Sequence, residues 1–363
     1  MKKFMLFAAM ACVALTSCVN EDDMAVVNES AAIKFDSPVL KNTRVNVNGE
    51  IETNLYPTAE TFNVFCKIYE GDYAGWTTST NVNNYFGANG DVAAHNANTG
   101  TSSNYWATAT TYYWPDAGYN LAFAAYSPAV FATAPTSIAR TDAGLQIEGF
   151  QTETASDAHY DVMYTSTVYD RNKTNNASQA VSLVFKHALS SIVFSSQKAN
   201  SDVVYEITDI KVTGEFYTKG DFNQGVTGSV VGSVYAETEA PAWTLKEKSN
   251  VNYDPTFNAF NVPQATPEIF TAGSAAILPI PQDVPADATV HVTYNKTASG
   301  TTTDHVVSIK LSDFRTAEGN AINAWEIGKR YVYRIAFGQN NQIYFEPTVE
   351  PWVTQSTLIY TIN

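Results

Sequence analysis

Alternation of apolar and polar residues with a period of two constrains the fold of this chain more than any other feature. Phe62, Val64, Cys66 and Ile68 share one face of such a run. Because successive side chains of a β-strand point to opposite faces, the run predicts a strand in which Cys66 is a buried small hydrophobe. Further strands of the same kind are predicted at residues 121–126, 161–165, 181–186, 289–294, 305–311 and 330–337.

Clusters of Asn, Gly, Thr and Pro separate these runs, which is turn chemistry rather than helix chemistry. The best helical candidate, residues 313–325, is short. Many short strands with turn-rich connections predict an all-β protein made of antiparallel β-sandwiches. The length of 363 residues suggests two domains, and the polar stretch 169–178 marks the boundary between them. We therefore expect one sandwich over residues 45–177 and a second over residues 178–363, with a tail strand at its end.

The first 17 residues predict a secretory signal peptide of the lipoprotein type. Lys2 and Lys3 precede an uncharged apolar run that ends at Leu15 and is too short to span a bilayer. The sequence LTSC follows at residues 15–18, with small residues before a cysteine that can carry a diacylglycerol. We therefore predict lipidation at Cys18, since two acyl chains anchor a protein stably where one does not. The acidic residues directly after Cys18 resemble a surface-export signal, and they also suit a solvated tether.

Charge and cysteine content narrow the classes of partner. The net charge of −15 becomes −17 once Lys2 and Lys3 leave with the signal peptide, which disfavours nucleic acid and anionic lipid headgroups as partners. Of the three cysteines, Cys12 lies in the signal peptide and Cys18 is the lipidation site. Cys66 then has no partner for an intramolecular disulfide.

No enzyme signature emerges from the remaining residues. The five histidines are scattered, and metalloprotease, phosphate-binding, dinucleotide-binding and serine-hydrolase motifs are absent. His187 falls on the apolar side of its strand, where a core histidine bonded to a backbone group is expected. Asp161, at the start of the sequence DVMY, is expected to serve a turn or a cap. We therefore predict no catalytic residues, no metal and no cofactor.

Several segments, in order, resemble the fimbrillin-like family, the subunits and accessory proteins of type V pili in Bacteroides-group bacteria. The segments are YWP at residues 113–115, FAAYSP at 123–128, DVMY at 161–164, VSLVFKHAL at 181–189, LPIPQ at 278–282, WEIGKRYVY at 325–333 and VEPW at 349–352. Their order behind a lipoprotein signal makes the resemblance specific.

The resemblance implies two transthyretin-like antiparallel β-sandwich domains in tandem, on an outer-membrane lipoprotein at the cell surface. It also implies that an Arg-specific extracellular protease removes a first strand, and that a strand of another fimbrial subunit replaces it. The matching bond is Arg44–Val45, within a segment 18–44 that combines the tether and a removable strand containing Ile33 and Phe35. Lys41 and Arg140 are alternative cleavage positions.

The replacing strand is predicted in the C-terminal tail, where Leu358, Tyr360 and Ile362 alternate with the spacing of Ile33 and Phe35. The tail also fits as the last strand of its own domain. The alternative function is a surface glycan-binding lipoprotein of a sugar-uptake system. In that case the tryptophans at positions 76, 106 and 114 would form a stacking platform rather than fill a core.

Overall fold

The computed structural model describes residues 32–36, 56–71, 73, 75–76, 82–96, 105–153, 159–176, 180–199, 201–231, 234–264, 266–314, 320–338 and 343–351. Strands dominate these residues, and the helical elements among them are the single turn α2 (Lys173–Asn176) and the 3-10 turns η2 (Gly273–Ala275) and η3 (Leu311–Asp313). The predicted all-β fold is confirmed. The short helix predicted over 313–325 is wrong at both described ends, because Asp313 closes η3 and Trp325 lies in a strand, buried in a core.

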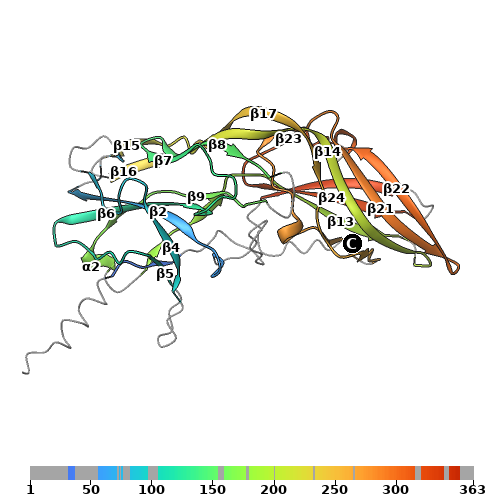
Figure 1. Cartoon of the computed structure of the whole chain (residues 1–363), viewed down its shortest axis with the longest axis horizontal. Coiled ribbons are helices and arrows are strands. Elements are labelled where there is room, and N and C mark those ends of the chain that lie inside the picture. Colours follow the sequence, from blue (N-terminus) through green and yellow to red (C-terminus); the bar gives the residue numbers. More distant parts are fainter. Residues whose placement is uncertain are drawn as a thin grey trace, which may run out of the picture.

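A ten-stranded sheet forms one end of the elongated molecule (Figure 1). Its order is β11-β1-β5-β4-β2-β6-β9-β12, with β3 attached to β2 and β10 to β6. Its strands are β1 (Phe35–Asp36), β2 (Phe62–Glu70), β3 (Asn83–Asn84), β4 (Asp91–Asn96), β5 (Tyr105–Thr108), β6 (Tyr119–Ser127), β9 (Met163–Thr165), β10 (Val168–Arg171), β11 (Val181–Ser182) and β12 (Phe185–His187). Because β11 and β12 are close neighbours in the chain, the two ends of the path meet and the sheet wraps around its own core.

The alternation in β2 and β6 explains why this sheet has two buried faces. Phe62, Val64 and Cys66 of β2 point into the core that the sheet encloses, whereas Phe65 and Tyr69 point outward and are equally buried. The outer face is buried because a second sheet covers it. The prediction that Cys66 is a buried residue is confirmed, since it is 1% exposed, and burial raises the pKa of its thiol.

A four-stranded sheet and part of a seven-stranded sheet build the other end of the molecule (Figure 1). The four-stranded sheet, in the order β19-β13-β24-β25, consists of β13 (Ser191–Lys198), β19 (Glu268–Ile269), β24 (Lys329–Phe337) and β25 (Ile343–Pro351). The seven-stranded sheet runs β22-β21-β14-β8-β7 with β17 and β18 on β14, and consists of β7 (Ser137–Thr141), β8 (Gly144–Gln151), β14 (Val204–Asn223), β17 (Ala242–Tyr253), β18 (Phe260–Asn261), β21 (Thr289–Ala298) and β22 (Thr301–Lys310). Two small ribbons pair β15 (Thr227–Val231) with β16 (Val234–Thr238), and β20 (Gln282–Asp283) with β23 (Ala324–Trp325).

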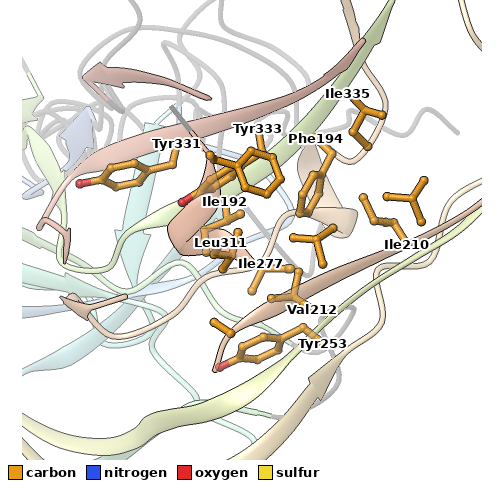
Figure 2. Close-up of a cluster of buried hydrophobic side chains, with 14 of the residues drawn as sticks. Ile192, Phe194, Ile210, Val212, Tyr253, Ile277, Leu311, Tyr331, Tyr333 and Ile335 are labelled. Carbon is orange, nitrogen blue, oxygen red and sulfur yellow. The ribbon is translucent and has the colours of Figure 1, made fainter. Parts of the chain in front are cut away.

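Side chains from these two sheets interdigitate to form the core of a β-sandwich (Figure 2). Phe194 of β13 and Tyr333 of β24 face Ile210 and Val212 of β14 across it. All four are fully buried. This is the packing that the alternating pattern of these segments predicts.

The 20-residue strand β14 links the two ends of the molecule, as its course in Figure 1 shows. Its first part pairs with β21 over the sandwich core, and its last part pairs with β8. Phe222 near its end packs with Ile147 and Phe150 of β8, in a separate core that includes Phe65 of β2. A single strand therefore contributes to two cores.

The predicted boundary between residues 177 and 178 lies outside the described residues. Strands from each side of this position belong to a sheet of the other side. β11 and β12 follow it but join the first sheet, whereas β7 and β8 precede it but join the sheet of β14. The division of the chain at this position stays a prediction.

Candidate functional site

The short strand β1 fills a position inside the first sheet, and we take it with its surroundings as the candidate site. Phe35 pairs with Val181 of β11 in parallel and with Trp106 of β5 in antiparallel register. Three backbone hydrogen bonds flank the strand: Val181 N–H to the Lys34 carbonyl (2.8 Å), Leu183 N–H to the Asp36 carbonyl (2.8 Å) and Ile33 N–H to the Tyr112 carbonyl (2.9 Å). β1 therefore closes the sheet between β11 and β5.

Phe35 is the main anchor of β1. Its ring is fully buried and meets three phenyl rings edge to face, with centroids at 5.5 Å for Phe123, 6.3 Å for Phe62 and 6.4 Å for Phe86. Edge-to-face packing places the positive ring edge against a negative ring face, which is favourable. Ile33, two residues earlier, is 3% exposed in the same core. The two side chains that the sequence singled out on this strand are thus both core residues.

Lys34 lies between these anchors and faces the other way. Its ammonium group lies 4.4 Å from the centroid of the Tyr105 ring on β5, a cation–π contact. Residues 33–35 therefore present apolar side chains inward and a cation outward, as an extended segment with one buried face does.

Trp106 is the residue of β5 directly opposite Phe35, and the sequence did not assign it this place. It is 4% exposed, and its ring lies 5.0 Å from the His95 ring and 5.9 Å from the Tyr56 ring. Its indole Nε1 has no hydrogen-bond partner, and neither has Nε2 of His95, although both atoms are buried. Only the pairing of β1 with β5 reveals that Trp106 lies opposite Phe35.

The remaining predicted site residues cannot be placed beside β1. The lipidation, cleavage and tail positions lie outside the described residues: Cys18, Arg44, Val45, Leu358, Tyr360 and Ile362. Of the alternative cleavage positions, Lys41 is also outside them, whereas Arg140 is described and buried at 7% exposure.

Arg140 is held by contacts on several sides. Its guanidinium lies 4.8 Å from the centroid of the Trp76 ring and 3.6 Å from the Glu237 carboxylate. It also donates hydrogen bonds to the Thr141 carbonyl and the Thr167 hydroxyl. A protease cannot reach this residue while the chain is folded, so burial argues against Arg140 as a cleavage site.

A buried pair, Asp161 and His187, lies away from β1. His187 Nδ1 is 2.9 Å from Asp161 Oδ1, and both side chains are at most 5% exposed. The turn or cap role expected for Asp161 stays a prediction, and the structure adds that its carboxylate is buried against the imidazole. His159 is also buried, and its Nδ1 accepts from the Leu278 N–H, which leaves Nε2 to donate to the Glu153 carbonyl. This pattern fixes a neutral ring.

The three tryptophans considered for sugar stacking are core residues. Trp76, Trp106 and Trp114 are 3–5% exposed. No group of three or more His, Cys, Asp or Glu side chains that could hold a metal ion occurs among the described residues. Nor does the described part of the chain contain a helix with the length and apolar character needed to cross a bilayer.

Comparison with known proteins relates most of this chain to one group. A family model described as fimbrillin-like matches residues 70–352. The solved structure of a fimbrial protein from Bacteroides vulgatus is 16% identical, covers 89% of this chain and 99% of its own, and superposes with a TM-score of 0.54. The solved structure of a candidate cell adhesion protein from Bacteroides uniformis is 14% identical. It covers 88% of this chain and 99% of its own, with a TM-score of 0.49. No curated protein matches the chain.

Proposed function

Because the chain belongs to the fimbrillin-like family, we propose that it is a structural subunit of a fimbrium, a pilus that supports adhesion, and not an enzyme. In this proposal it is exported as a lipoprotein and held at the outer membrane by acyl chains on Cys18. Its partners are other fimbrial subunits, the membrane and an Arg-specific extracellular protease. The chain is expected to form two transthyretin-like sandwiches in tandem.

The position of β1 is the observation that carries the proposal. A two-residue strand closes the first sheet, and it belongs to a short described segment, residues 32–36, that precedes Arg44. Cleavage after Arg44 would leave β1 attached to the body through non-covalent contacts alone. Its loss would open the sheet between β11 and β5.

The opened sheet would bind a replacement strand strongly. Backbone groups of Val181, Leu183 and Tyr112 would lose their partners, at a cost of about 1–3 kcal/mol each if they stay buried. The apolar pockets that Ile33 and Phe35 fill would be exposed to water. Filling them again would stabilise the complex by about 1.5–3 kcal/mol per large side chain. Such an edge favours β-augmentation by another chain.

The tail of a second subunit has a suitable pattern. Leu358, Tyr360 and Ile362 alternate and would face inward, as Ile33 and Phe35 do. A contact from the tail of one copy to the first sheet of the next is head-to-tail, so it does not close into a dimer and grows a fibre.

The glycan-binding alternative receives no support from the described residues. A stacking platform needs exposed aromatic faces, and the candidate tryptophans are buried.

Limited digestion with an Arg-specific protease tests the proposal. We expect release of residues 18–44 and a stable body that begins at Val45, followed by SDS-resistant multimers. Arg44→Ala should abolish both, with little change in Tm, because substitutions outside packed cores typically cost less than about 0.5 kcal/mol. Lys41→Ala is the matched control and should be cleaved normally.

Deletion of residues 354–363 tests the tail. The shortened protein should keep its Tm and its cleavage at Arg44 but lose polymerisation. A large loss of stability would show instead that the tail belongs to its own sheet. Prior cleavage at interior arginines, or fibres formed by tail-deleted protein, would contradict the proposal.

A further inference from the structure

The site of β1 contains two buried polar atoms that β1 leaves without partners. Phe35, Trp106 and His95 are in direct register across β1, β5 and β4, so their side chains lie on one face of the sheet. Trp106 Nε1 and His95 Nε2 have no hydrogen-bond partner, and their rings are 5.0 Å apart. Most buried polar groups in native proteins are paired, so two neighbouring exceptions need a reason.

Phe35 cannot serve these atoms. It has no acceptor or donor, and the rings that it meets edge to face are Phe62, Phe86 and Phe123, which have none either. The position opposite Trp106 thus accommodates an aromatic ring, but the ring of Phe35 provides no hydrogen-bond partner for Trp106 Nε1. A ring that carried a hydroxyl could both accept from an indole N–H and donate to an imidazole nitrogen.

The tail offers such a ring. Tyr360 is flanked at a distance of two residues by Leu358 and Ile362. A strand that places Tyr360 opposite Trp106 therefore places a large aliphatic residue where Ile33 lies, whichever way the strand runs. The tail thereby offers counterparts of the Ile33 and Phe35 side chains and adds a hydroxyl.

We propose that Trp106 selects a tyrosine-bearing strand. The hydroxyl of Tyr360 from a second copy of this chain replaces the missing partner of Trp106 Nε1. The inference rests on the proposed strand exchange and deepens it. It supplies a reason for exchange to proceed, because the incoming strand makes a hydrogen bond that β1 does not make.

Stability measurements on the uncleaved chain test whether a hydroxyl at position 35 can bind Trp106, without a second copy or a peptide. Phe35→Tyr should raise the folded-to-unfolded ratio about fivefold in urea denaturation, the effect of one net hydrogen bond. In a chain that carries Trp106→Phe the same substitution should give no gain. Lys34→Ala, on the outward side of β1, is the control and should show no dependence on Trp106. An equal loss of stability on Phe35→Tyr in both backgrounds would overturn the inference and leave strand exchange untouched.

Peptide binding tests the exchange itself. A synthetic peptide of residues 353–363 is titrated into full-length chain that carries Phe35→Ala, in which the resident strand is weakened. The natural peptide should bind about fivefold more tightly than one carrying Tyr360→Phe, and Trp106→Phe in the protein should remove the difference. Equal affinities would overturn selection by Trp106 alone. Failure of both peptides to bind would overturn the proposed exchange and the inference with it.

Discussion

Single buried contacts stabilise the closure of the first sheet, and the pair Asp161 and His187 is the clearest case. His187 is the last residue of β12, which ends the path of this sheet, and Asp161 precedes β9, its antiparallel neighbour. Their 2.9 Å contact therefore joins two segments near the point where the ends of the sheet meet. We infer that the pair is structural, because both residues lie in a packed interior.

Removal of the imidazole should destabilise the protein. We expect His187→Ala to lower the free energy of unfolding by about 1–3 kcal/mol, the cost of removing one partner of a buried polar group. His305→Ala serves as the control, since that ring stacks on Tyr294 at the half-buried edge of the seven-stranded sheet and should cost less than about 1 kcal/mol. Urea denaturation measures both. Equal effects would show that the pair contributes nothing specific.

Two of the described strands, β1 and β13, each make a parallel pairing. β1 pairs in parallel with β11, and β13 pairs in parallel with β24, whereas the other pairings between described strands are antiparallel. Their extents differ, because β13 is paired from Ser191 to Lys198 and β1 over two residues. A strand with few pairs can leave at lower cost than one paired along its full length, so β1 is the strand of the two that the proposed exchange would release.

Hydrogen exchange should report this difference. The amides of Val181 and Leu183 donate to the carbonyls of Lys34 and Asp36, so they should exchange earlier than the amides of β13 and β24. Mass spectrometry of peptides that cover residues 181–183 and 191–198 measures the two rates in the uncleaved chain. Later exchange at 181–183 than at 191–198 would mean that β1 is held as firmly as β13, and would count against its removal.

The whole molecule carries many buried tyrosines, and their hydroxyls should make it sensitive to alkali. Burial raises the pKa of Tyr331 and of Tyr169 to about 12, and raises that of Tyr73 further. In the unfolded chain these groups ionise near pH 10. Between pH 10 and 12 the unfolded state therefore loses protons that the folded state keeps, and stability falls as pH rises.

We expect each such tyrosine to lower the free energy of unfolding by about 1.4 kcal/mol per pH unit above pH 10. Tyr73→Phe is the matched variant, because the Tyr73 hydroxyl has no hydrogen-bond partner to lose. It should leave stability at pH 7 nearly unchanged and reduce the slope by about that amount. Urea denaturation from pH 8 to 11.5 measures the slope, and a flat profile would refute the expectation.

The sequence by itself determined the local structure of this protein. Strands such as 62–70 and 329–337, and the burial of Cys66 and Phe35, follow from alternation, since the direction of a side chain depends on its position along its own strand. The signal peptide is likewise predicted from local residues and the Arg44 bond from the family resemblance, and both stay predictions.

Only the tertiary structure decided which segments are partners. Alternation is the same whichever strand lies alongside, so it does not show that β1 lies between β11 and β5, or that β14 extends from one core to the next. For the same reason it did not reveal that Asp161 meets His187, or that Trp106 stands opposite Phe35 with an unpaired nitrogen. The pairing of strands depends on the shape and polarity of surfaces built from segments that are far apart in the sequence. Such surfaces exist only once the sheets have formed.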